Sequence, residues 1–492
     1  MLYDLKFLNT GEVFPPESEM ERLDGYRRYE MERNGEPWQA NNGYLERLMY
    51  VLSNYSLYDY QLYMYDSDAF ASIVDKIKNV TVGRRPIIRL PEKEEINDVG
   101  EIVKTEDERQ TELSKLLKEK NLFKKIRRIV EDMVVYGDIP VKLYTTEKGE
   151  KRVSLLSPSM WFPVVEKGES SEIRYNVIAW VAKNGDDVEK SELHVQVYDD
   201  IEETVTNRIF GISQYNGDRT VKCWKNRTVT GEGYKLGAER KGRSFDGFTT
   251  GVYSMETAKI MPITFCGRSN TPYGRSLFDR LESTIMEYYM RVSLKNVVLD
   301  KFSAPKLSGP HLMTPEDAQL PNYIELNAGE NPPNYLVWDA NMTAVENTIS
   351  MLKNDLSNAS GLGSLLDTSV FGDSQGYDAL MIKLTPALQE AEGITEEIED
   401  ALSEIIAYLS DGLVQADEIT IVWKTGVPES KNQIANTAKL HKETGWSQKR
   451  VNVVDYEMTP MEAQAEEERK RAETPQIPFG GTNADWEEGD ED

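Results

Sequence analysis

Two amphipathic segments of helical length, 272–302 and 340–360, constrain the fold of this chain more than any other feature. Apolar residues recur in both at intervals of three and four, which indicates helices with one buried face. The first segment is expected to begin with Thr271 as its cap and Pro272 in its first turn. The intervening stretch, 303–338, contains six prolines, which prevent a continuous helix. The pattern therefore predicts two stiff helices joined by an irregular insert, with an adaptable contact surface at one end.

A glycine-containing loop, 361–376, follows the second helical segment. It holds four glycines and five large apolar residues: Leu362, Leu365, Leu366, Val370 and Phe371. Apolar side chains in a mobile loop gain little burial in a single subunit. Two interpretations are therefore open, a loop that packs with its equivalents around a channel and a loop inserted into the core.

The N-terminal third begins with a polar stretch, 1–40, which is expected to form an arm with a short helix around 17–32. The next stretch, 41–66, is rich in tyrosine and has helical spacing in its first half. Such tyrosines could stack on nucleic-acid bases, but packing in a core or an interface is the favoured interpretation. Periodicity and turn residues then predict, in order, a helix over 70–79, a strand over 86–90, an acidic loop over 91–105, one long helix over 106–136 that ends at Gly137, antiparallel strands over 139–265, and loop structure over 225–255.

The C-terminal part of the chain reads mainly as helix. Residues 377–409 are expected to be helical, with interruptions near Pro386 and Gly393. The elements expected after this helix are a strand over 418–424, helices over 430–444 and 447–473, and a disordered acidic tail over 474–492. No secretory signal or apolar stretch of membrane-spanning length is recognised, so a cytoplasmic protein, or a particle assembled in the cytoplasm, is expected.

The charge balance is strongly acidic, with 84 acidic residues, 57 basic residues and a net charge of −27. Tight binding to DNA or RNA requires neutralisation of phosphates, and this balance argues against it. The same charge is compatible with a surface past which DNA slides, and it also serves simply to keep a large protein soluble. The two cysteines, Cys223 and Cys266, and the three separated histidines predict neither a disulfide framework nor a metal site, and no cofactor is expected.

Catalytic motifs are almost absent. The phosphate-binding pattern GxxxxGK[ST], HExxH and GxGxxG do not occur. One string, Gly372–Gly376, fits the serine elbow GxSxG, with Ser374 as nucleophile and His441 downstream. That elbow follows a buried parallel strand, whereas the strands expected upstream are antiparallel, and a short pattern arises easily in a glycine-rich loop. The chain is therefore predicted not to be an enzyme.

Seven strings in order, over roughly four-fifths of the chain, resemble the portal proteins, or head-to-tail connectors, of tailed bacteriophages. These strings are Ile73-Val-Asp-Lys-Ile-Lys78 with Gly83-Arg-Arg-Pro-Ile-Ile88, Met133–Tyr144, Ser157–Val164, Tyr273-Gly-Arg-Ser-Leu-Phe-Asp-Arg-Leu281, Ala304–Leu307, Ser360-Gly-Leu362 with Gly376–Leu380, and Thr444–Arg450 with Glu466–Lys470. The arm and the acidic tail fall outside the resemblance.

The resemblance implies an α+β portal fold and a ring of typically twelve subunits around a tunnel at one capsid vertex. It divides the chain into an arm 1–40, a wing 41–271, stem helices 272–302 and 339–360, a clip 303–338, a tunnel loop 361–376, a wing return 377–427, crown helices 428–473 and the tail 474–492. The implied partners are double-stranded DNA, bound transiently and without sequence preference, the terminase large subunit as packaging motor, the major capsid and scaffold proteins, and a neck or tail adaptor. No membrane partner is implied, and the expected location is the virion.

The site residues follow from this assignment. The residues expected nearest to DNA are Leu362, Ser364, Leu365, Leu366, Val370 and Phe371. Possible phosphate contacts are Lys295, Lys301, Lys306 and Lys353, although Lys353 could equally pair with Asp355 or Glu346. The residues expected in the motor-docking clip are Pro305, His311, Tyr323 and Tyr335. The alternatives are another virion structural or adaptor protein without a channel, a hydrolase that uses Ser374, and a general interaction scaffold.

Overall fold

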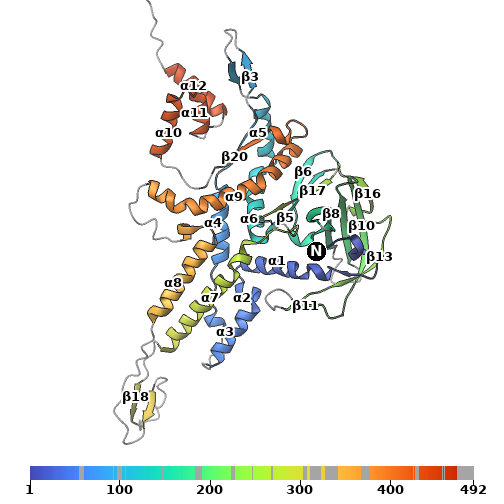
Figure 1. Ribbon diagram of the computed structural model, residues 1–492, viewed down its shortest axis with the longest axis vertical. Helices are drawn as coiled ribbons and strands as arrows, with labels where there is room; N and C mark the ends of the chain where they lie inside the picture. The colour runs from blue at the N-terminus through green and yellow to red at the C-terminus, as the bar shows by residue number, and fades with distance from the viewer. Residues whose placement is uncertain are drawn as a thin grey trace, which may run out of the picture. The chain divides into compact units, whose positions relative to one another are not determined.

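An antiparallel sheet and a set of helices packed on a second, smaller sheet make up most of the computed structural model (Figure 1). The chain separates into two compact units, Met1–Gly426 and Val427–Asp492, which are described separately. The structure describes residues 1–54, 60–91, 93–96, 102–105, 107–146, 148–167, 169–182, 191–222, 228–245, 248–256, 258–267, 270–302, 307–310, 323–326, 342–366, 377–424, 426, 431–456, 458 and 460–473.

The larger sheet confirms the antiparallel strands predicted for the middle of the chain. Its order is β1-β13-β10-β9-β8-β7, with β16 also paired to β10, and every pairing is antiparallel. The strands are β1 (Val13–Phe14), β7 (Trp161–Glu166), β8 (Glu169–Ala182), β9 (Glu192–Asp199), β10 (Thr204–Gln214), β13 (Tyr234–Glu239) and β16 (Gly251–Ser254). In β9, Leu193, Val195 and Val197 enter one apolar cluster while Tyr198 enters another, because successive side chains point to opposite faces. The sheet is therefore covered on both faces.

The loop expected over 225–255 is wrong, because this stretch contains strands. Besides β13 and β16 it holds β12 (Thr228–Thr230), which pairs with β11 (Thr220–Lys222), and the hairpin β14 (Ser244–Phe245) with β15 (Phe248–Thr249). Leu236 of β13 is buried in the cluster beneath the sheet. The polar, glycine-rich composition concealed these strands, and two of them, β13 and β16, pair with β10, which lies outside the stretch.

The N-terminal stretch packs on this sheet within the subunit rather than extending as an arm. Its elements are the 3-10 turns η1 (Leu5–Leu8) and η2 (Glu17–Glu19), strand β1, and helices α1 (Met20–Arg33) and α2 (Pro37–Ala40). The helix expected around 17–32 is confirmed. Phe7, Leu8 and Phe14 are buried, and the ring of Phe14 lies 5.0 Å from that of Phe162. Burial of these apolar side chains ties the chain start to the sheet.

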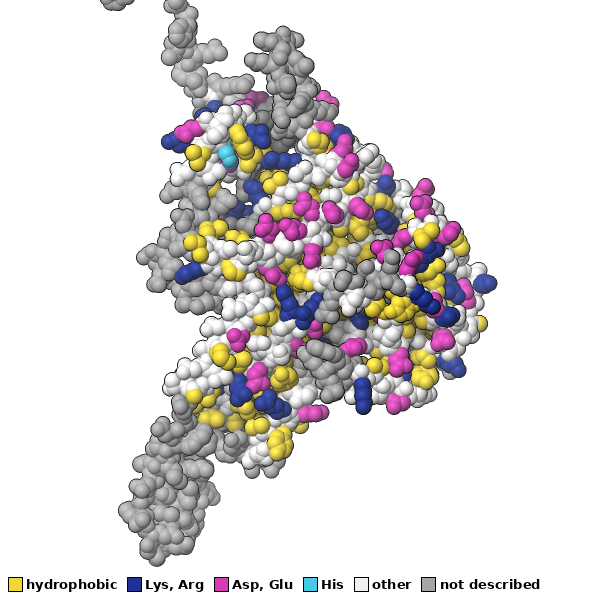
Figure 2. All heavy atoms as spheres, viewed as in Figure 1, with side chains coloured by type: hydrophobic (Ala, Val, Ile, Leu, Met, Phe, Trp, Pro, Cys, Tyr) yellow, Lys and Arg dark blue, Asp and Glu magenta, His cyan; other side chains and the backbone are white. Residues whose placement is uncertain are grey.

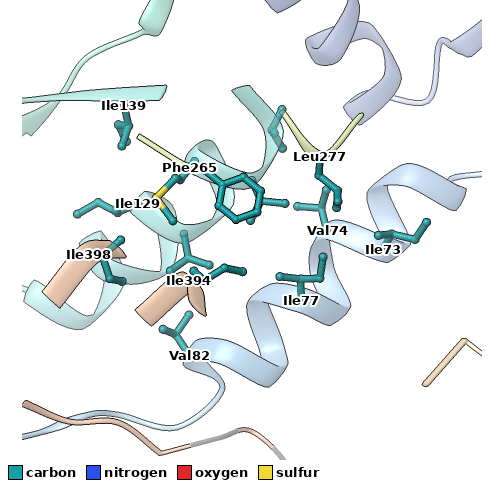
Figure 3. Packing of buried hydrophobic residues seen from close by; sticks show 14 of the residues in the cluster. Ile73, Val74, Ile77, Val82, Ile129, Ile139, Phe265, Leu277, Ile394 and Ile398 are labelled. Atoms are coloured by element: carbon teal, nitrogen blue, oxygen red, sulfur yellow. The ribbon is translucent and has the colours of Figure 1, made fainter. Parts of the chain in front are cut away.

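Helices and the three-stranded sheet β17-β5-β6 form the largest core. Figure 3 shows Ile73, Val74 and Ile77 of α4 gathered with Ile394 and Ile398. The helix predicted over 70–79 is thus confirmed, since its apolar stripe faces this core. The elements around the core are α3 (Asn42–Asn54), η3 (Tyr60–Tyr63), α4 (Ala69–Val82), α5 (Arg109–Glu119), α6 (Leu122–Tyr136), β5 (Asp138–Thr145), β6 (Lys151–Leu155), η4 (Pro158–Met160), β17 (Ala258–Thr264), α7 (Leu277–Phe302), α8 (Met342–Ala359), α9 (Tyr377–Leu409) and η10 (Ala416–Glu418).

The single long helix predicted over 106–136 is two helices, α5 and α6. The chain turns at Asn121, whose φ of 53° is left-handed and cannot continue an α-helix. The predicted end at Gly137 is confirmed, with a φ of 86°. The apolar periodicity runs through the break, so a prediction from periodicity alone joined the two helices.

The acidic loop expected over 91–105 contains a hairpin. Strand β3 (Lys93–Ile96) pairs antiparallel with β4 (Ile102–Thr105). Charged residues have low strand propensity, and their density concealed the hairpin. The preceding strand, β2 (Ile87–Arg89), pairs with β20 (Thr420–Val422), so both of these predicted strands are confirmed, although shorter than expected.

Helix α9 runs without interruption from Tyr377 to Leu409, so the breaks expected near Pro386 and Gly393 are wrong. Pro386 cannot donate to the carbonyl four residues earlier, that of Ile382, but Ile382 is 74% exposed and water can reach that part of the helix. Within the proline-rich insert, β18 (Leu307–Pro310) pairs parallel with β19 (Tyr323–Leu326).

The second unit consists, in its described residues, of helices α10 (Lys431–Glu443), α11 (Gln448–Val454) and α12 (Pro460–Glu473). The single helix predicted over 447–473 is therefore two helices. The side chain of Ser447 accepts a hydrogen bond from the amide of Arg450 and caps α11. His441 stacks on Trp446 and contacts the carboxylate of Asp455 at 3.0 Å, which fastens α10 to α11.

Candidate functional site

Helix α7, one of the two helices on which the functional interpretation depends, begins later than expected. The sequence pattern placed its start at Thr271 and Pro272, but the first helical residue is Leu277. The hydroxyl of Ser276 accepts a hydrogen bond of 3.0 Å from the amide of Phe278 and so acts as the cap. Thr271 instead accepts from the amide of Tyr273, within the turn before the helix. The cap is displaced because the turn is held by tertiary contacts that no local pattern records.

The turn before α7 is fastened to the start of β5. Asp138 accepts a hydrogen bond of 2.6 Å from the amide of Gly274 and a second one from the hydroxyl of Tyr26. Burial raises the pKa of Asp138 to about 6. A Cβ atom on Gly274 would lie 2.1 Å from the carbonyl oxygen of Gly137, so only glycine permits this approach. Two of the strings that carry the sequence resemblance, Met133–Tyr144 and Tyr273–Leu281, therefore meet here. Their shared Tyr-Gly pair was the available signal, but it predicted helix ends and not contact.

Helices α7 and α8 lie side by side (Figure 1). Leu352 and Leu356 of α8 are buried in the main core, and the ammonium of Lys295 on α7 lies 3.0 Å from the carboxylate of Glu346 on α8. The ammonium of Lys353 lies 5.9 Å from the ring centre of Tyr288, a cation–π contact. Glu346 thus pairs with Lys295 and not with Lys353.

The tyrosine-rich stretch before α4 also packs against α7. The Tyr65 ring lies 6.1 Å from the Tyr288 ring, and the Tyr65 amide donates to the hydroxyl of Ser293. Tyr63 donates a hydrogen bond of 2.5 Å to Asp300. The favoured interpretation, packing rather than base stacking, is confirmed for these two tyrosines.

The base of the glycine loop is part of the subunit core. Leu362 is 1% exposed and joins the main apolar cluster, so its side chain offers no surface to a passing duplex. Gly361 and Gly363 have positive φ angles of 74° and 51° and turn the chain from α8 into the 3-10 turn η8 (Gly363–Leu366). Lys76 of α4 donates a hydrogen bond of 3.1 Å to the carbonyl of Leu365. The first residues of the loop therefore anchor it.

Several predicted residues lie outside the described residues: Lys306, Pro305, His311, Tyr335, Val370, Phe371 and Ser374. For four others the structure describes the backbone but not the side chain: Lys301 in α7, Tyr323 in β19, and Ser364 and Leu366 in η8.

Other kinds of site are not found in the described part of the chain. No three His, Cys, Asp or Glu side chains gather there in a manner suited to a metal ion. None of the helices in that part combines the length and apolar character that crossing a bilayer requires.

A comparison with known protein families finds a match for the central segment of the chain. The model of the family described as "Phage portal protein, SPP1 Gp6-like" matches residues 96–219. Residues 96–219 are similar to phage portal proteins. This portal segment runs from the end of β3 through α5 and α6 to the turn after β10, and so includes much of the larger sheet.

The match confirms the resemblance over residues 96–219, which hold two of the seven strings, Met133–Tyr144 and Ser157–Val164. Phage portal proteins are structural proteins of the virion that act in DNA packaging and have no enzymatic activity, in agreement with the prediction that this chain is not an enzyme. No curated protein matches the chain.

Proposed function

We propose that copies of this chain close into a ring at one vertex of a phage capsid, through which double-stranded DNA is packaged and later ejected. The portal match over 96–219 supports this role. The observation that carries it is the arrangement of α7, α8 and α9: two packed helices, an insert at one end and a loop anchored at the other. In this proposal α7 and α8 are the stem, the insert between them is the clip, and α10 to α12 are the crown.

The loop between α8 and α9 is the proposed contact with DNA. Leu362 at its start, and Leu384 and Ala387 beyond its end, are all buried in the subunit. The ten residues 367–376 are thus joined at both ends to parts of the chain that are packed in the core. A segment that narrows a channel must be held in place in this way. The net charge of −27 supports passage of a duplex without tight binding, because an acidic wall repels phosphates.

The proposed partners follow from this role. The clip would bind the terminase large subunit during packaging and a neck or tail adaptor afterwards, and the outer parts would contact capsid and scaffold proteins. DNA would be a transient partner, driven by the ATPase of the motor.

Electron microscopy and native mass measurement of the purified chain test the ring. The expected result is an annular particle of about twelve subunits with a central hole. A chain that stays monomeric under all assembly conditions would contradict the proposal, and a closed particle without a hole would indicate a virion adaptor instead.

A loop variant tests the contact with DNA. Replacing residues 367–374 with a Gly/Ser segment of equal length leaves Leu362 and Leu365 in place, so the subunit should fold and assemble. Packaging or retention of DNA should fall in an assay with capsids and motor. Normal packaging by correctly assembled variant rings would show that the loop does not contact the duplex.

A further inference from the structure

Charge is segregated along this chain in a way that the net value conceals. Residues 384–423 contain ten acidic residues and no lysine, arginine or histidine. Residues 115–128 contain seven lysines and arginines and a single acid. The first segment covers most of α9, and the second covers the end of α5 and the first half of α6. An acidic protein thus carries one strongly basic segment.

The acidic face of α9 is defined by Glu392, Glu396 and Asp400, which are all exposed. Their four-residue spacing places them along one side of the helix. Within the described residues none of these three carboxylates has a hydrogen-bond or ion-pair partner, whereas Glu404, the next residue at this spacing, pairs with Lys259 at 3.4 Å. Figure 2 shows acidic side chains gathered over this part of the surface. Like charges in such a row repel one another, and a basic partner would relieve that repulsion.

The basic face of α5 and α6 is defined by Lys115, Lys118, Lys124 and Arg128, which are all exposed. Arg128 has an ion pair with Asp132 on its own helix at 3.4 Å. Lys124 and Arg128 line a shallow depression together with two further basic residues, Lys78 and Arg127, and two acids, Glu131 and Asp132. The ammonium groups of Lys115, Lys118 and Lys124 have no ion-pair partner among the described residues.

The two faces do not neutralise each other within one subunit. Two acids near the end of the acidic segment pair with residues outside the basic face: Glu418 with Arg109 at the start of α5, at 3.1 Å, and Asp411 with Lys151 of β6, at 2.9 Å. One compact unit therefore presents two separate surfaces of opposite charge. A closed ring of identical subunits requires two different, complementary surfaces on each copy, and surfaces of opposite charge meet this requirement.

We propose that the acidic face of α9 in one copy docks on the basic face of α5 and α6 in the next copy around the ring. This inference rests on the ring proposed above. Charge pairs at such a contact add specificity and speed of association more than affinity. They also impose one direction on the ring, because an acidic face repels a second acidic face.

Paired charge reversals test the contact. The acidic-face variant carries Glu392→Lys, Glu396→Lys and Asp400→Lys, and the basic-face variant carries Lys115→Glu, Lys118→Glu and Lys124→Glu. Each variant alone would bring like charges together at every contact, so association should weaken by about tenfold or more. In an equimolar mixture each variant is complementary to the other on both faces. The mixture should therefore form rings in which the two variants alternate. Native mass spectrometry should find equal numbers of the two variants in each ring.

A control separates this contact from nonspecific effects of charge. Glu172→Lys with Glu202→Lys changes two exposed acids outside both faces, one in β8 and one in the turn between β9 and β10, and should leave assembly unchanged. Circular dichroism of each variant verifies that the subunits are folded.

The outcomes distinguish this contact from the proposed function. Wild-type rings together with unimpaired rings of both single variants would overturn the docking contact and leave the ring intact. A basic-face variant that assembles normally but no longer retains DNA would assign that face to DNA. A wild-type chain that never assembles would remove both proposals.

Discussion

The carboxylate of Asp138 accepts a 2.6 Å hydrogen bond from the amide of Gly274, across 136 positions of sequence. The bond joins the first residue of β5 to the turn before α7, and the hydroxyl of Tyr26 from α1 completes the cluster. The long helix of the proposed stem is thus fastened to the sheet and to the N-terminal helix through one buried side chain.

Removal of this carboxylate should destabilise the subunit. Asp138→Ala leaves the Gly274 amide and the Tyr26 hydroxyl without their acceptor, and the free energy of unfolding should fall by about 1–3 kcal/mol. Asp138→Asn keeps an acceptor oxygen for Gly274 and should lose less. Urea unfolding of the two variants measures the difference, and an alanine variant as stable as the wild type would contradict this role for Asp138.

The close approach of Gly274 to Gly137 predicts a large effect of one methyl group. In Gly274→Ala the new Cβ would lie 2.1 Å from the Gly137 carbonyl oxygen, so backbone must move and the subunit should lose about 3 kcal/mol. The matched control is Gly43→Ala in α3, where no atom lies within 4 Å of the added Cβ. Its thermal midpoint should be equal to or slightly above that of the wild type. Equal midpoints for the two variants would refute the packing argument.

Glu32 predicts a pH dependence of stability. Burial and the nearby carboxylate of Glu282 raise its pKa to about 8, while Asn41 donates a 3.0 Å hydrogen bond to its Oε1. The folded chain holds this proton up to a higher pH than the unfolded chain, so the stability contributed by Glu32 is present at low pH and declines as pH rises from about 4.5 to about 8.

Glu32→Gln should remove this decline, since the amide stays neutral and keeps the acceptor for Asn41. Each tenfold difference in proton affinity corresponds to about 1.4 kcal/mol. At pH 9 the free energy of unfolding of the variant should therefore exceed that of the wild type by on the order of a few kcal/mol. Thermal midpoints measured at pH 5 and pH 9 test the sign. A constant gap between variant and wild type would show that Glu32 does not bind a proton in this range.

The anchor of the proposed tunnel loop can be tested on the subunit alone. Leu362→Ala removes a side chain that is 1% exposed and should cost about 2–5 kcal/mol of unfolding free energy. Met351→Ala on α8, 56% exposed, is the control and should change it by less than about 0.5 kcal/mol. If both variants unfold at the same urea concentration, Leu362 does not anchor the loop.

Two lysines of the proposed stem should differ in their effect on DNA. Lys295 is paired with Glu346, and Lys295→Ala should change stability by about 0–1 kcal/mol because the pair is partly exposed to water, which weakens it. Lys353 is exposed over Tyr288. If it touches phosphates, Lys353→Ala should lower DNA retention and its salt dependence while the subunit keeps its stability. Retention by assembled rings at several salt concentrations would decide, and unchanged values would remove Lys353 from the proposed contacts.

Local patterns predicted much of the fold where a segment carries its own signal. The helix at α4, the end of α6 at Gly137 and the antiparallel strands of the middle region follow from periodicity and from one left-handed glycine. The errors lie where the deciding contact is distant or where periodicity runs through a break. Strand β13 depends on β1 and β10, and α7 begins late because Gly274 is held by Asp138.

The sequence by itself determined the α+β class, the portal resemblance and the position of the two helices that flank the insert. Only the tertiary structure decided that Leu362 is an anchor, that Lys295 pairs with Glu346, and that two Tyr-Gly strings meet at Asp138. The physical reason is the distance along the sequence over which each signal acts. Apolar periodicity and turn residues determine structure only within a few positions of themselves. A buried hydrogen bond or a close backbone approach instead joins residues that only the packed core brings together.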